Sequence, residues 1–100
     1  MIVAIHAYEG VFGGLHGIEE YTVVEVNDLK EAETIAEEMA YNVVEDYSSQ
    51  FDEEYLEDPE LYWEIYEVTD TQGKDEYQLD GEYYNDPEGF IADYGCVQVI

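Results

Sequence analysis

Acidic side chains outnumber basic ones in this chain by a margin that restricts how it can fold. The 100 residues include 27 Asp and Glu, only two basic residues (Lys30 and Lys74) and two His, so the formal net charge at pH 7 is −25. Because burying an unpaired carboxylate is costly, the fold must place nearly all of these groups on its surface. A field of one sign also repels itself and opposes compaction. We therefore expect an external partner to supply the missing cations.

The apolar content is nevertheless sufficient for a folded core. Hydrophobic residues make up 46% of the sequence, and 11 Tyr and one Trp add large rings that can pack at one end and hydrate at the other. A length of 100 residues is typical of one domain. We expect residues 1–100 to form a single acidic domain.

Nothing in the sequence indicates export or membrane insertion. The first residues, MIVAIHAYEG, lack the basic start and the apolar length of a signal peptide, and no apolar run approaches transmembrane length. An anionic lipid surface would also repel so acidic a protein. We expect a cytoplasmic protein with no membrane partner. Cys96, the one cysteine, cannot form an intrachain disulfide and is interpreted as a small buried residue of a terminal strand.

The N-terminal part of the chain predicts two paired strands. Residues 1–8 (MIVAIHAY) are almost continuously apolar and β-branched, which is typical of a central strand. The glycine-rich stretch EGVFGGLHG at 9–17 predicts a wide hairpin loop. Residues 19–26 (EEYTVVEV) alternate in polarity, so we expect a second strand antiparallel to the first.

A long amphipathic helix should follow from residue 29. Asp28 and Glu31 have the spacing of an N-cap and a capping box. Apolar residues then recur three and four positions apart, as on the buried face of a helix: Leu29, Ala32, Ile35, Ala36, Met39, Ala40, Val43 and Val44.

The C-terminal half is harder to interpret. We expect an acidic loop at 48–60 and a third strand at 61–68, although Asp58-Pro59-Glu60 could instead start a helix there. Residues 71–85 suggest turns with a short strand near 76–79. Asp86-Pro87-Glu88 predicts a short helix that Gly95 ends, and residues 96–100 a last strand. The predicted fold class is α+β, a small antiparallel sheet of three to five strands with the long helix on one face and a short second helix near the C-terminus.

The sequence gives no support for an enzyme or a metal site. Among 27 acids, carboxylate pairs occur at every spacing, so none marks a catalytic pair. Neither Gly73 nor Gly81 lies at the sixth position of an ordered calcium loop. His6 and His16, even with Cys96, lack the paired spacing of zinc ligands. We expect no catalytic residues, no metal and no cofactor.

Direct nucleic-acid binding is also excluded. A phosphate-binding loop needs backbone N–H groups at a helix start and usually a lysine, which the glycine-rich stretch does not offer. Basic residues dominate affinity for nucleic acids, and this chain has two.

The acids themselves are therefore the candidate functional groups. From Glu31 through Asp70 there are fifteen acids and no base, interleaved with tyrosines, which favour protein-binding faces. We predict that the partner-binding residues are Glu31, Glu37, Glu38, Glu45, Asp46, Asp52, Glu53, Glu54, Tyr55, Glu57, Asp58 and Glu60.

The chain is small, nearly lacks Lys and Arg, is rich in Glu, Asp and Tyr, and contains the densely acidic stretch EDYSSQFDEEYLEDPE (45–60). In these features it resembles the phage-encoded DNA mimics. These include anti-restriction proteins, anti-CRISPR inhibitors and uracil-glycosylase inhibitors. The resemblance covers composition and charge pattern only. It implies a non-enzymatic inhibitor, a monomer or homodimer in the host cell cytoplasm, that places carboxylates where phosphates would lie in the DNA- or RNA-binding groove of a basic nuclease or defence effector.

Two other interpretations remain open at this point. An antitoxin or immunity-type protein that neutralises a basic toxin or nuclease would have the same kind of surface. A halophile's acidic small domain with an unrelated role would also be acidic, although its charge should be spread around the molecule and its folding should require molar salt.

Overall fold

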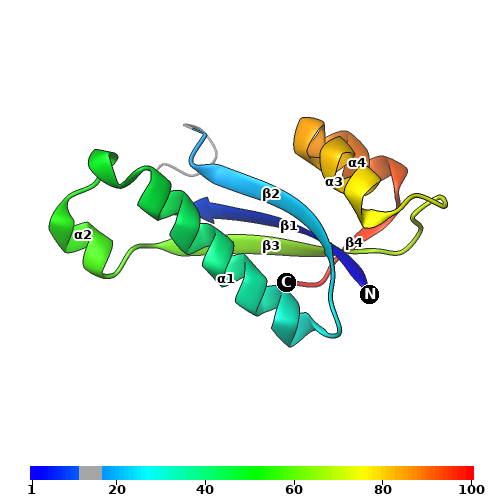
Figure 1. Ribbon diagram of the computed structural model, residues 1–100, viewed down its shortest axis with the longest axis horizontal. Coiled ribbons are helices and arrows are strands. Elements are labelled where there is room, and N and C mark those ends of the chain that lie inside the picture. Colours follow the sequence, from blue (N-terminus) through cyan, green and yellow to red (C-terminus); the bar gives the residue numbers. More distant parts are fainter. Residues whose placement is uncertain (12–16) are drawn as a thin grey trace.

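A computed structural model describes residues 1–11 and 17–100 of the chain (Figure 1). Its strands form one antiparallel sheet in the order β2-β1-β3-β4, and their bounds are Ile2–Glu9 (β1), Glu19–Glu25 (β2), Leu61–Val68 (β3) and Cys96–Gln98 (β4). The helices are Leu29–Asp46 (α1), Glu53–Glu57 (α2), Glu76–Asn85 (α3) and Pro87–Asp93 (α4), with a 3-10 turn at Ser48–Gln50 (η2). The predicted α+β class is confirmed.

Strand β1 lies inside the sheet, as its apolar sequence predicts. It pairs with β2 from Ile2↔Glu25 to Tyr8↔Glu19, and with β3 from Val3↔Glu67 to Glu9↔Leu61. The strand alternative for 61–68 is therefore correct, and Asp58 ends α2 instead of starting a helix. Most of the predicted hairpin loop falls at 12–16, outside the described residues.

Helix α1 covers one face of the sheet. Val3, Ile5 and Ala7 of β1 and Ile65 of β3 form a core with the buried face of the helix. The predicted N-cap is confirmed, since the Asp28 carboxylate accepts a hydrogen bond from the Glu31 N–H at 2.8 Å. The Glu31 carboxylate accepts from the N–H of Asn27 at 2.9 Å, one residue earlier than a standard capping box would have it. Leu29, at the start of the predicted stripe, remains exposed.

Helices α3 and α4 pack on the other face, at the end of the sheet away from α2 (Figure 1). The predicted helix at 86 is confirmed, because Asp86 caps it through the Gly89 N–H and Gly95 follows with a positive φ of 63°. The predicted short strand near 76–79 is wrong, because these residues begin α3. An Asp75–Gln78 capping box starts this helix, and Leu79 and Tyr83, four residues apart, are buried beneath it.

The predicted acidic loop at 48–60 is only partly correct. Residues Ser48–Gln50 form η2 and Glu53–Glu57 form α2, which lies at one end of the molecule beyond the C-terminal end of α1 (Figure 1). Acids in the first turn favour a helix because they complement its dipole. None of the helices among the described residues is long and apolar enough to cross a membrane.

Carboxylates of α3 accept hydrogen bonds from backbone N–H groups on the outer edge of β2. Among the described strands, β2 pairs with β1 alone, so alternate N–H groups of β2 point away from the sheet. Asp80 accepts from the Val23 N–H at 2.7 Å, and Glu76 accepts from the Glu25 N–H at 2.9 Å. These acids have a structural role that the sequence alone did not reveal.

Candidate partner-binding surfaces

Ten of the twelve predicted partner-binding residues are exposed, while Glu31 and Tyr55 are half-buried. The ten lie along the outer side of α1 and continue around α2, so they extend from one flank of the molecule to one of its ends (Figure 1). We call them the acidic face: Glu37, Glu38, Glu45, Asp46, Asp52, Glu53, Glu54, Glu57, Asp58 and Glu60.

Side chains of the acidic face form no hydrogen bond or ion pair with any other described residue. Asp52 precedes α2 but does not cap it through its side chain. Acids elsewhere behave differently, since Asp28, Asp75 and Asp86 cap helices and Asp80 satisfies the β2 edge. The fold therefore uses some acids outside the acidic face for its own hydrogen bonds, although others there, such as Glu25, Glu33 and Asp93, are exposed like those of the acidic face.

Tyr55, one of the two half-buried residues of the predicted set, anchors the acidic face to the sheet. Its hydroxyl donates to the carboxylate of Glu9, which is fully buried, and accepts from the Glu60 N–H at 3.0 Å. The same carboxylate also accepts from the Val11 N–H at 2.5 Å. Burial and the hydrogen bond to Glu9 raise the pKa of Tyr55 to about 12. This contact fixes α2 to the end of β1, 46 residues away in the sequence.

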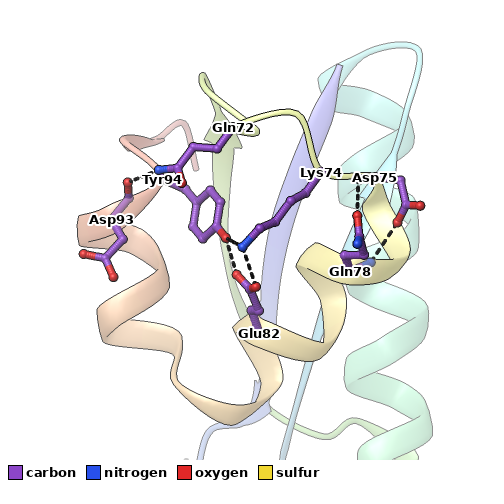
Figure 2. Close-up of polar contacts among 7 residues, drawn as sticks. All are labelled: Gln72, Lys74, Asp75, Gln78, Glu82, Asp93 and Tyr94. Atoms are coloured by element: carbon purple, nitrogen blue, oxygen red, sulfur yellow. Dashed lines mark hydrogen bonds and ion pairs between the residues drawn. The ribbon is translucent and has the colours of Figure 1, made fainter.

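One lysine is neutralised within the fold. Figure 2 shows the Lys74 ammonium donating to Glu82 at 2.7 Å and to the Tyr94 hydroxyl at 2.5 Å, while that hydroxyl donates to Glu82. The hydrogen bond to Glu82 raises the pKa of Lys74, and Lys74 lowers the pKa of Glu82. The Gln72 side chain donates to the Asp93 carbonyl at 2.9 Å nearby. This network joins the loop before α3 to both C-terminal helices and lies at the end of the molecule opposite α2.

A small apolar pocket opens within the acidic face. It has a volume of about 260 Å³ and lies between the end of α1 and α2, and its lining residues are Tyr41, Val44, Glu45, Ser48, Leu56 and Pro59. Tyr41 is half exposed. The predicted interleaving of aromatic rings with charges is therefore present in this part of the structure.

A second surface, on the sheet face opposite α1, was not anticipated from the sequence. The strand register places Tyr21 of β2, His6 of β1 and Glu64 of β3 in one row. His6 Nε2 lies 2.6 Å from the Glu19 carboxylate, and His6 Nδ1 lies 3.8 Å from that of Glu64. The Tyr66 hydroxyl donates to Glu64 at 3.1 Å.

No metal centre is evident in the described part of the chain, where no group of three or more His, Cys, Asp or Glu side chains could hold an ion. Of the residues considered for zinc, His16 lies outside the described residues and His6 is paired with Glu19. Cys96 is half-buried in β4, and burial raises the pKa of its thiol, so the thiolate that would bind a metal is disfavoured.

Comparison of the chain with protein-family models, with curated proteins and with solved structures gives no match. The features of the chain that bear on its function are therefore its own two surfaces, the acidic face and the row of Tyr21, His6 and Glu64 on the sheet.

Proposed function

We propose that this protein is a non-enzymatic inhibitor that imitates nucleic-acid phosphates and occupies the DNA- or RNA-binding groove of a basic nuclease or defence effector. Its linear charge density is the observation that carries the proposal. The molecule is 45 Å long, so its 25 net charges amount to one per 1.8 Å (45/25). Duplex DNA carries one charge per about 1.7 Å of axis. Residues 12–16 carry no formal charge, so the net charge of the full sequence is also the net charge of the residues that the structure describes.

The spacing on α1 supports the same proposal. Glu38 and Glu45 are seven residues apart, which is a rise of about 10.5 Å along a helix. An α-helix has about 3.6 residues per turn, so the two carboxylates lie on the same side of α1, about two turns apart. A basic groove that runs along this helix can contact both of them.

Anchoring of α2 gives the proposal a further basis. A surface that is already ordered before binding loses less conformational entropy when it binds. The contact of Tyr55 with Glu9 and Glu60 orders α2 without using the carboxylates of the acidic face. These carboxylates remain available to the Lys and Arg side chains of a partner in the host cytoplasm.

Inhibition of DNA cleavage provides the test. The protein is titrated into reactions of purified restriction endonucleases and RNA-guided nucleases, and its affinity for each inhibited enzyme is measured at increasing salt. Displacement of six to ten phosphate contacts implies a loss of about 10³–10⁵ in affinity between about 50 and 200 mM salt, together with competition by duplex DNA or by guide RNA. Binding that is insensitive to both salt and nucleic acid would rule out phosphate mimicry.

A matched pair of variants locates the contact. Glu53→Lys/Glu57→Lys reverses two charges on α2, and Glu25→Lys/Asp93→Lys reverses two exposed charges on β2 and α4. Two surface pairs of up to about 1 kcal/mol each correspond to roughly ten- to thirtyfold weaker inhibition for the first variant. Equal losses in both variants would show that net charge, and not the acidic face, determines binding.

A further inference from the structure

Four aromatic rings stack in series across the sheet face opposite α1. The Tyr21 and His6 rings are 4.5 Å apart, those of His6 and Tyr8 are 4.8 Å apart, and those of Tyr8 and Tyr62 are 5.9 Å apart. Their planes differ by 18–27°. Helices α3 and α4 cover only one end of this face, and at the other end Tyr62 is 51% exposed. The four rings therefore form one continuous stack, which we call the aromatic platform, in which His6 and Tyr8 each lie between two other rings and Tyr62 is the exposed end.

A pocket of about 280 Å³ lies where this platform meets α4. His6, Tyr21 and Tyr66 from the three strands line it together with Tyr83, and carboxylates enter it from two sides, Glu64 on β3 and Glu88 on α4. Sites for drug-sized ligands are usually about 300–1,000 Å³. The space therefore suits one long side chain better than a nucleotide.

The pocket has a negative electrostatic potential. Burial raises the pKa of Tyr8, Tyr66 and Tyr83, and raises that of Tyr21 to about 12. The charge of Glu64 is a further cause in all four tyrosines, and Glu88 contributes at Tyr21. Glu64 and Glu88 line the pocket, whereas Glu19, which contacts His6, does not. Glu64 also accepts from the Tyr66 hydroxyl at 3.1 Å, and Glu88 comes from α4 on the other side of the pocket.

These features together select the chemistry of the ligand. Aromatic rings exposed on a sheet commonly stack nucleobases, but a net charge of −25 repels the phosphates that accompany them. A planar cation in the pocket can contact both the tyrosine rings and the two carboxylates that line it. The guanidinium group stacks on aromatic faces and pairs with carboxylates through its fork of N–H groups, whereas an ammonium is a compact and strongly hydrated point charge.

We propose that the pocket between the aromatic platform and α4 binds the guanidinium group of an arginine side chain presented by a protein partner. The assignment of the arginine to a basic protein rests on the proposed function. The preference for a guanidinium group rests on the pocket itself. The partner then contacts the inhibitor on both sides of the sheet, with phosphate-binding groups at the acidic face and one arginine in the pocket.

Titration of the full chain with amino-acid probes, monitored by NMR, tests the pocket directly. The probes are N-acetyl-arginine methylamide, its lysine counterpart, and its citrulline counterpart, which keeps the planar shape without the charge. The arginine probe should shift the ring resonances of His6, Tyr21 and Tyr66, the lysine probe should bind more weakly, and the citrulline probe should cause no shifts. Lysine binding as tight as arginine binding, or shifts with citrulline, would overturn the assignment.

Three variants complete the experiment. Glu64→Gln and Glu88→Gln remove the charges in the pocket, and Glu67→Gln removes one from the same strand on its opposite face. Hydrogen bonds to charged groups contribute enough that each pocket variant should bind the arginine probe about tenfold more weakly, whereas Glu67→Gln should bind it normally. Native spectra of each variant show that it folds, and equal affinity in all three would refute the pocket.

The proposed function and the proposed arginine pocket can be refuted independently of each other. The substitutions of Glu53→Lys/Glu57→Lys lie outside the pocket, so this variant should inhibit about ten- to thirtyfold more weakly and keep its affinity for the arginine probe. An intact chain that binds the arginine probe but inhibits no nuclease would contradict the proposed function and leave the pocket standing. A chain that inhibits a nuclease but shows no arginine-induced shifts would contradict the pocket alone.

Discussion

Removing one oxygen atom from Tyr55 should weaken the whole fold. In Tyr55→Phe the ring remains stacked on Phe51, with its centroid 5.0 Å from that of Phe51, but the buried Glu9 carboxylate loses the hydroxyl that donates to it and the Glu60 N–H loses its acceptor. A hydrogen bond to a charged group contributes about 1.5–3 kcal/mol. We expect a loss of that size in the free energy of unfolding, which for a domain of this length lowers Tm by about 6–24 °C.

Urea unfolding followed by circular dichroism measures this loss. The matched control is Tyr77→Phe, which removes a hydroxyl from a side chain that is 89% exposed and should change stability by less than about 0.5 kcal/mol. The double variant Glu9→Gln/Tyr55→Phe completes a cycle with the two single variants, and a coupling of at least about 0.5 kcal/mol is expected between residues in contact. A Tyr55→Phe loss equal to that of the control, or a coupling near zero, would refute the anchoring role.

The pH dependence of the same variant gives an independent check. A pKa raised from 10.0 to about 12 in the folded protein favours the neutral phenol. Its contribution to stability is therefore complete below pH 10 and is lost as the pH rises through about 12. The stability difference between wild type and Tyr55→Phe should narrow over that interval. A difference that stays constant up to pH 12 would contradict the assigned hydrogen bond.

Three further variants test other contacts. Asp80→Ala removes the acceptor of the Val23 N–H and should lower the free energy of unfolding by about 1 kcal/mol, with faster amide exchange in β2 measured by NMR. Glu20→Gln should raise the free energy of unfolding at pH 7 by a few tenths of a kcal/mol, because burial and the charges of Asp46 and Asp80 raise the pKa of Glu20. Urea unfolding should show that this gain in free energy disappears below pH 4.5, where the unfolded chain is protonated as well. Lys74→Met should lower Tm. Because Lys74 lowers the pKa of Glu82, the difference in Tm between wild type and this variant should shrink as the pH falls below 4.5. High salt should shrink the same difference.

Local patterns in the sequence predict some elements well and others poorly. The apolar run of β1 and the three-and-four spacing of α1 lie within single elements, so both were predicted correctly. Helix α3 was missed although its Asp75–Gln78 capping box is visible in the sequence, because Gly81 interrupts it and most of its side chains are polar. Only Leu79 and Tyr83, four residues apart, mark its buried side.

The candidate surfaces also differ in how far the sequence predicts them. Exposure of the acidic face could be predicted because unpaired carboxylates must lie outside the core. The hydroxyl of Tyr55 and the carboxylate of Glu9 meet across 46 residues, and no local pattern reveals such a contact. The aromatic pocket also depends on the register that aligns His6 with Tyr21 on one side and with Glu64 on the other. A shift of one residue in either pairing would send those side chains to opposite faces.

Carboxylates of α3 on the edge of β2 have a consequence for how the protein tolerates changes of charge. An uncovered edge strand is a template for pairing with another chain, which leads to domain swapping and aggregation. Asp80 and Glu76 already occupy two of its N–H groups, so these two groups are not available to pair with a neighbouring molecule. The acids of the chain are therefore not interchangeable units of one negative field. Under the proposed function, neutralising the acidic face should weaken partner binding and leave this edge covered. Neutralising Asp80 and Glu76 should instead free two N–H groups of the edge to pair with another copy of the chain.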